Sequence, residues 1–129
     1  MFLLPVSLTT AAAAALINFW LGLRVGQVRT AEKISVGDGG NLRLIARMRA
    51  QLNFAEYTPI VLILLALIEL AREASIWLWV VALVYIVGRV LHAFGMDGFR
   101  FGRAAGTATT MLTMLGLAVY AALLAYRVI

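Results

Sequence analysis

Four long apolar segments, separated by short polar ones, constrain this chain more than any other feature of its sequence. They cover about residues 2–23, 50–71, 75–94 and 104–126. A helix of about 20 apolar residues is long enough to cross a bilayer, and four such helices use nearly all of the chain. The sequence therefore predicts an all-α fold, a single integral membrane domain over residues 1–129 that is built as a four-helix bundle.

The composition supports this prediction and excludes several classes of protein. Hydrophobic residues make up 64% of the chain and charged residues 13%, whereas soluble domains average about half and about a quarter. There is no cysteine, so the chain supplies no disulfide, thiol nucleophile or thiolate ligand. One histidine and scattered acids beside arginines make a poor metal site, and we expect neither a metal nor an organic cofactor.

The distribution of basic residues predicts the orientation in the membrane. Nine of the 11 flank the first and third connections, and the other two, Arg72 and Arg127, lie toward the opposite side. The nine are Arg24, Arg29, Lys33, Arg43, Arg47, Arg49, Arg89, Arg100 and Arg103. Positive charge favours the cytoplasmic side, so both termini are predicted outside and both polar loops inside, in the inner membrane if the source is bacterial. This confinement to loops also argues against a nucleic-acid partner for a chain of net charge +5.

The first apolar segment could be either a retained membrane span or a cleaved signal peptide. The segment lacks a basic leader, so a retained span is favoured over a cleaved signal peptide.

Glu69 and Glu73 lie near Arg72 at the opposite interface, and we interpret both as solvated. The fourth segment has a face of small residues that we expect to pack against another helix: Gly102, Gly106, Thr109, Thr113, Gly116 and Tyr120.

Polar side chains open the second apolar segment, where they are costly in hydrocarbon and therefore suggest function. Arg49, Asn53, Glu56 and Tyr57 fall at i, i+4, i+7 and i+8, which is one face of a helix. Gln51 lies roughly 200° from Arg49, at about 100° per residue. It should therefore face a different neighbour.

The third segment carries a similar stripe, formed by Tyr85, Arg89, His92 and Met96. Both stripes reach the membrane edge at which the fourth helix begins with Arg103. We therefore predict a pocket rich in guanidinium groups, with one acid, one imidazole and two phenols. The planar guanidinium pairs well with carboxylates, so the expected ligand is a small anion with more than one carboxylate.

The string from Arg49 to Pro59, RAQLNFAEYTP, resembles the signature of the MAPEG family, the membrane-associated proteins in eicosanoid and glutathione metabolism. The segment from Val84 to Met96, VYIVGRVLHAFGM, resembles the third helix of the small bacterial members. The spacing to Arg103 also fits, and the resemblance extends from about Leu21 to the end of the chain. Where the leukotriene-forming members carry tyrosines, this chain has His92 and Met96.

The resemblance implies a homotrimer that binds glutathione between neighbouring subunits near the cytoplasmic face, as in microsomal glutathione transferases. Arg103 stands where the family has the arginine that activates the glutathione thiol. Arg49, Asn53, Glu56 and Tyr57 would hold the charged ends of the tripeptide, with Arg89 and His92 in the same pocket. The adjacent subunit would supply Gln51 and Arg29.

The implied activity is that of a membrane glutathione transferase, with glutathione-dependent peroxidase activity as an addition. A free thiol has a pKa of about 8.5, and a fixed guanidinium stabilises the thiolate. The thiolate would attack a hydrophobic electrophile or a lipid hydroperoxide dissolved in the membrane lipid. Such chemistry is typical of detoxification.

Several alternatives stay open at this stage. Arg100 competes with Arg103 as the activating residue, and Arg49 could be an interface anchor. Glu56 could pair with Arg49 or Arg89 instead of binding the ligand, and Arg89 could equally be an internal salt-bridge partner. His92 could be a pocket-lining residue or a general base.

Two other classes of function remain. A non-catalytic scaffold or lipid-binding protein of the same fold is one, and a small transporter or channel subunit is the other. The channel is disfavoured because residues 61–67 are wholly apolar, so polar groups extend only part of the way through the membrane.

Overall fold

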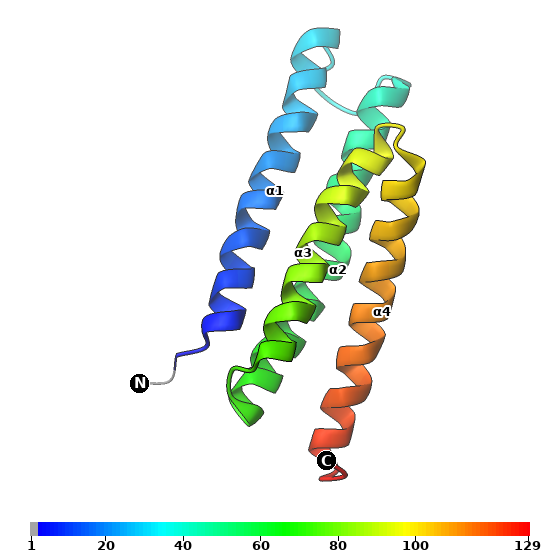
Figure 1. Cartoon of the computed structure of the whole chain (residues 1–129). Coiled ribbons are helices and arrows are strands. Elements are labelled where there is room, and N and C mark those ends of the chain that lie inside the picture. The colour runs from blue at the N-terminus through cyan, green and yellow to red at the C-terminus, as the bar shows by residue number, and fades with distance from the viewer. Residues whose placement is uncertain (1–2) are drawn as a thin grey trace.

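The computed structural model describes residues 3–129 and contains four helices within them (Figure 1). These are α1 (Pro5–Glu32), α2 (Leu42–Arg72), α3 (Ile76–Met96) and α4 (Arg100–Ala125). All four are long and apolar enough to cross a membrane. The predicted all-helical fold is confirmed. Helices α1 and α2 extend beyond the apolar segments, because the polar residues that flank those segments continue the helices.

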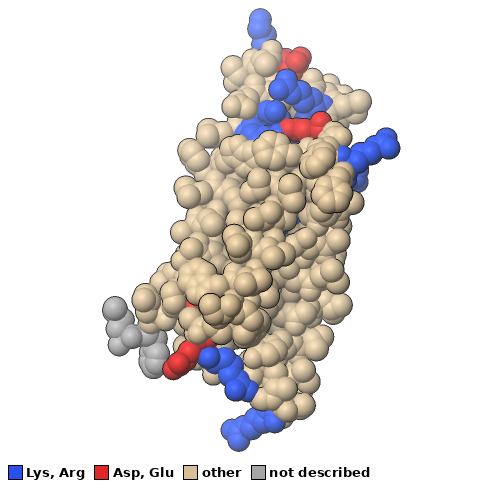
Figure 2. Space-filling view, viewed as in Figure 1, with Lys and Arg blue, Asp and Glu red and all other residues tan. Residues whose placement is uncertain are grey.

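The helices lie side by side, with the α1–α2 loop and the α3–α4 turn at one end of the bundle (Figure 1). The start of α1, the C-terminus and the α2–α3 turn lie at the other end. Helices α2 and α3 each contact every other helix, whereas α1 and α4 do not touch one another. Charged side chains gather at the two ends of the bundle, and the middle of the face in Figure 2 is uncharged.

The core lies along the axis of the bundle. Toward the end with the α2–α3 turn, Val61, Leu65 and Ile68 of α2 pack with Leu78 and Tyr85 of α3. A second cluster, nearer the loops, packs α1 against α2 and includes Leu21 and Phe54. The same stretch of α2 that the sequence marks as apolar therefore fills the bundle.

Glycines let α3 and α4 approach closely near the loop end. A Cβ atom on Gly106 would overlap the Cβ of His92 and lie 2.6 Å from the carbonyl oxygen of Gly88. A Cβ on Gly102 would lie 2.5 Å from the carbonyl oxygen of Leu91. The predicted packing of the small-residue face is confirmed at these two positions. Gly116 differs, because the space around it is open.

Glu69 is not solvated, and that interpretation of the sequence is wrong. The residue is 1% exposed, and its carboxylate accepts hydrogen bonds of 2.8 Å from the backbone N–H groups of Val6 and Ser7. The first turn of a helix has free N–H groups and a partial positive charge, both of which a carboxylate satisfies. Glu73, by contrast, is exposed as predicted. The sequence does not reveal this cap because α1 and Glu69 meet only in the folded hairpin.

Candidate functional site

A cavity of about 360 Å³ lies between α2, α3 and α4 near the loop end of the bundle. Its lining contains five of the predicted site residues. The full lining is Arg49, Leu52, Asn53, Glu56, His92, Met96, Arg103 and Thr107. Helical spacing explains its composition, because each helix contributes residues three or four positions apart. We call this space the Arg103 cavity.

The Arg103 cavity contains two guanidinium groups and one carboxylate that are not paired with each other. Within residues 3–129 both ion pairs involve Asp97, so Glu56 pairs with neither Arg49 nor Arg89. Arg49, Glu56 and Arg103 are exposed in the single chain, and His92 is only 4% exposed. The cavity therefore offers free cations and a free anion to a zwitterionic ligand, on a side that the protomer leaves open.

Arg89 lies behind the Arg103 cavity and does not line it. It is 2% exposed, and it donates hydrogen bonds to Oγ1 of Thr110 at 2.8 Å and to Oδ1 of Asn53 at 2.6 Å. Its guanidinium carbon lies 5.8 Å from the centre of the Phe54 ring. Our grouping of Arg89 with the loop charges is wrong, because the residue is enclosed by three helices. Within its own chain it supports Asn53, and its predicted contact with the ligand stays a prediction.

This bond also fixes the orientation of the Asn53 amide. A guanidinium only donates, so the oxygen of Asn53 must face Arg89. The NH2 group of Asn53 is then the part of the amide that a ligand in the cavity can engage.

The two phenols of the predicted pocket do not line the Arg103 cavity. Tyr57 is half-buried. Tyr85 is fully buried, and its hydroxyl hydrogen-bonds Oγ1 of Thr58 at 2.9 Å. The interpretation of Tyr85 as a pocket residue is therefore wrong, since this bond joins α2 to α3 in the core.

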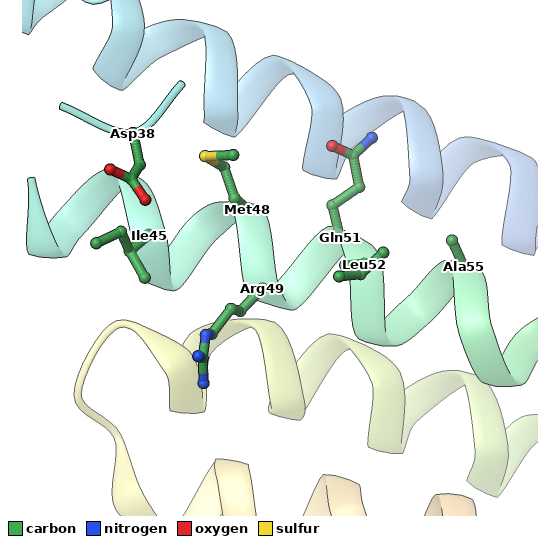
Figure 3. A pocket seen from close by; sticks show the side chains of 7 residues that line it. All are labelled: Asp38, Ile45, Met48, Arg49, Gln51, Leu52 and Ala55. Carbon is green, nitrogen blue, oxygen red and sulfur yellow. The ribbon is translucent and has the colours of Figure 1, made fainter. Parts of the chain in front are cut away.

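Gln51 faces a second and larger cavity of about 620 Å³ on the other side of α2 (Figure 3). In Figure 3 its side chain extends toward α1, whereas Arg49 extends toward α3. The predicted divergence of the two side chains is confirmed. Arg49 and Leu52 line both cavities, so the two spaces meet at this part of α2. The other lining residues are Asp38, Ile45, Met48 and Ala55.

Arg29 supports the loop between α1 and α2. Its guanidinium donates to the carbonyl oxygens of Gly37 at 2.8 Å and Ile34 at 3.3 Å. It also lies 3.7 Å from the sulfur of Met48, which lines the second cavity. Arg29 thus lines neither cavity within its own chain, and its predicted service to a neighbouring subunit stays a prediction.

Sequence reasoning did not identify Thr107 or the role of Asp97. Thr107 lies one helical turn beyond Arg103, so the same i, i+4 spacing that grouped the residues of α2 identifies it. Asp97 is the single acid between Gly95 and Arg103, a signal that was available in the sequence. Of the two candidate activating arginines, Arg103 lines the cavity and Arg100 does not.

Comparison with known proteins identifies the family. Residues 7–123 match the model of the MAPEG family. The chain is 28% identical over 112 residues to the inner membrane protein YecN of Escherichia coli K12, an alignment covering 85% of this chain and 86% of that protein. YecN of Escherichia coli O6:H1 strain CFT073 gives the same values. Because the family match covers most of the chain and every residue of both cavities, this protein belongs to the MAPEG family.

Proposed function

We propose that this protein is an integral inner membrane glutathione transferase that ionises the glutathione thiol in the Arg103 cavity. The observation that carries the proposal is the meeting of Arg49, Glu56 and Arg103 in one cavity without mutual ion pairs. Glutathione has two carboxylates, one ammonium group and one thiol. One free guanidinium group can pair with a carboxylate, the other with the ionised thiol, and the free carboxylate with the ammonium group.

The proposed roles follow from the chemistry of each side chain. Arg49 binds a carboxylate of glutathione, because a guanidinium forms two parallel hydrogen bonds with it. Glu56 accepts from the ammonium group, and the NH2 group of Asn53 donates to a carbonyl or carboxylate oxygen. Arg103 is the catalytic residue, because its charge stabilises the thiolate over the thiol.

The second substrate enters from the lipid in this proposal. The bonds that form and break are simple: the thiolate sulfur adds to an electrophilic carbon, and the leaving group departs with the electron pair. With a hydroperoxide the sulfur attacks the terminal oxygen, and a second glutathione then completes the reduction to alcohol, water and glutathione disulfide. The exposed side of the cavity is covered by a neighbouring protomer in the proposed homotrimer.

Ultraviolet absorbance of the thiolate tests this proposal directly. We expect glutathione to produce a thiolate signal on binding to the purified protein, and an aryl halide to be conjugated. Arg103→Ala should abolish the signal, while Arg100→Ala, a change of the same size three residues away, should retain it. If Arg100→Ala alone abolishes the signal, Arg100 activates the thiol.

The outcome that opposes the proposal is equally clear. A folded oligomer that binds no glutathione, conjugates no aryl halide and reduces no hydroperoxide is a scaffold of the same fold, and the transferase proposal then fails.

A further inference from the structure

One carboxylate outside the Arg103 cavity joins three parts of the chain. Asp97, in the turn between α3 and α4, pairs with Arg24 of α1 and, at 3.7 Å between Oδ1 and Nε, with Arg47 of α2. Arg47 also donates to the carbonyl oxygen of Arg24 at 2.9 Å. We call these three residues the Asp97 cluster.

The two arginine side chains of the Asp97 cluster are largely withdrawn from solvent, whereas Asp97 lies at the surface of the bundle. The side chains of Arg24, Arg47 and Asp97 are 8%, 12% and 28% exposed. The Arg24 guanidinium also lies 4.8 Å from the centre of the Trp20 ring and 5.4 Å from that of Phe94. Two neighbouring cations repel one another, and a buried charge without a counter-ion is strongly unfavourable. The carboxylate of Asp97 therefore offsets the repulsion between the two cations where α1 and α2 meet.

The turn that carries Asp97 also places Arg103. The N–H of Asp97 donates to the carbonyl of Phe94 at 3.1 Å, and that of Gly98 donates to the carbonyl of Gly95 at 3.2 Å. Gly95 abuts the backbone of Arg103 so closely that a Cβ atom there would overlap it. The turn that carries Asp97 is therefore packed directly against the first turn of α4.

The other side of the cavity is tied to the same carboxylate. Arg47 precedes Arg49 by two residues on α2, so its ion pair with Asp97 connects the turn to the part of α2 that carries Arg49. Helix α1 does not contact α4. Within residues 3–129, the ion pair of α1 is that of Arg24 with Asp97 in the α3–α4 turn. Asp97 thus links the helix that carries Arg49 to the helix that carries Arg103.

We propose that Asp97 is a positioning residue, whose pairs with Arg24 and Arg47 hold Arg103 at the correct place relative to Arg49 for thiol activation. This inference rests on the proposed glutathione chemistry. Asp97 does not line the cavity, so it acts through the turn and not on the ligand. Its loss should affect ionisation of the thiol more than binding of the tripeptide, because Arg103 follows the turn directly whereas Arg49 lies within α2.

The test is a pH titration of the bound thiolate in Asp97→Asn, which keeps the size of the side chain and removes its charge. We expect the pKa of the bound thiol to rise by about one unit, a tenfold loss of thiolate at neutral pH. The dissociation constant of glutathione should change less than threefold. Asp97→Glu should restore part of the shift, because it returns the charge.

Two further variants make the titration specific. Arg47→Gln removes the longer ion pair and leaves that of Arg24, so it should raise the thiol pKa less than Asp97→Asn does. Glu32→Gln is the matched control, because Glu32 is an exposed acid at the same end of the bundle that forms neither ion pair. It should titrate like the wild type.

Failure of this inference is distinct from failure of the proposed function. If the wild type forms a thiolate and the pKa is unchanged in both Asp97→Asn and Arg47→Gln, the positioning role is overturned and the transferase stands. If the wild type forms no thiolate, the function fails, and the role of Asp97 in catalysis fails with it.

Hydrogen exchange supplies a measurement that needs no activity. Amides of residues 97–103 should exchange faster in Asp97→Asn than in Glu32→Gln. Equal exchange in these two variants would show that the carboxylate does not hold the turn, which also overturns the inference.

Discussion

The guanidinium of Arg89 donates a hydrogen bond of 2.6 Å to the side-chain oxygen of Asn53, so a buried cation supports one wall of the Arg103 cavity. The same guanidinium reaches Thr110 on α4 at 2.8 Å. One side chain of α3 therefore joins α2 and α4 directly behind the candidate site. Buried polar groups of this kind are high in energy unless every contact is made, so the arrangement should be sensitive to small changes.

Arg89→Lys keeps the charge but replaces a planar fork by a single ammonium group, which cannot satisfy both acceptors with the same geometry. We expect affinity for glutathione to fall about tenfold, the effect of about 1.4 kcal/mol, as Asn53 loses its fixed orientation. Isothermal titration calorimetry measures this. Lys33→Arg, a basic exchange on the exposed end of the first loop, serves as the control, and equal affinity in the two variants would refute the supporting role.

Arg49→Gln should weaken glutathione binding without abolishing thiolate formation at saturating glutathione. A charge-assisted hydrogen bond contributes about 1.5–3 kcal/mol, which corresponds to a rise of the dissociation constant of about 10–100-fold. Thiolate absorbance as a function of glutathione concentration separates the two quantities. A lost signal at saturation, with affinity intact, would instead assign the activating role to Arg49.

Glu69→Gln should destabilise the protein, because an amide offers one acceptor where the carboxylate serves the N–H groups of both Val6 and Ser7. Loss of a helix cap costs about 0.5–2 kcal/mol. Thermal unfolding in detergent measures the change, and Glu73→Gln is the matched control because Glu73 is exposed. An unchanged midpoint in Glu69→Gln would show that the cap contributes nothing.

Gly106→Ala should force α3 and α4 apart, since the added methyl group would overlap the Cβ of His92. Overpacking of this kind costs about 1–3 kcal/mol, and the displacement of His92 and Arg103 should also reduce thiolate formation. Gly116→Ala is the control on the same helix, because no atom of another helix lies within 4 Å of the Cβ that the substitution adds. If both variants unfold at the same temperature, close helix contact at Gly106 is not limiting.

Relationships along one helix could be predicted from the sequence. The spacing of Arg49, Asn53 and Glu56 fixes them on one face because each residue advances by about 100°. For the same reason the sequence placed Gln51 apart from them. The close packing of α4 against another helix could also be predicted, because Gly102 and Gly106 have no side chains; that this helix is α3 comes from the structure.

Relationships between helices could not be predicted in the same way. The roles of Arg89 and Glu69 depend on hydrogen-bond partners on other helices. Which residues become those partners depends on how the helices are rotated relative to one another. From the sequence, Arg89 was grouped with the pocket residues, and Glu69 was interpreted as solvated because it lies near Arg72 at the opposite interface. The structure gives Arg89 two acceptors in the core and Glu69 the free N–H groups of a helix end.

The cap provided by Glu69 bears on the order in which this chain assembles. Glu69 follows Val6 by 63 residues, so during synthesis α1 emerges long before the carboxylate that completes its first turn exists. Until almost all of α2 has been made, the free N–H groups of the first turn of α1 need hydrogen bonds to water or lipid headgroups. The α1–α2 hairpin is therefore the earliest intermediate in which the first turn of α1 can lie inside the membrane with the N–H groups of Val6 and Ser7 hydrogen-bonded to Glu69.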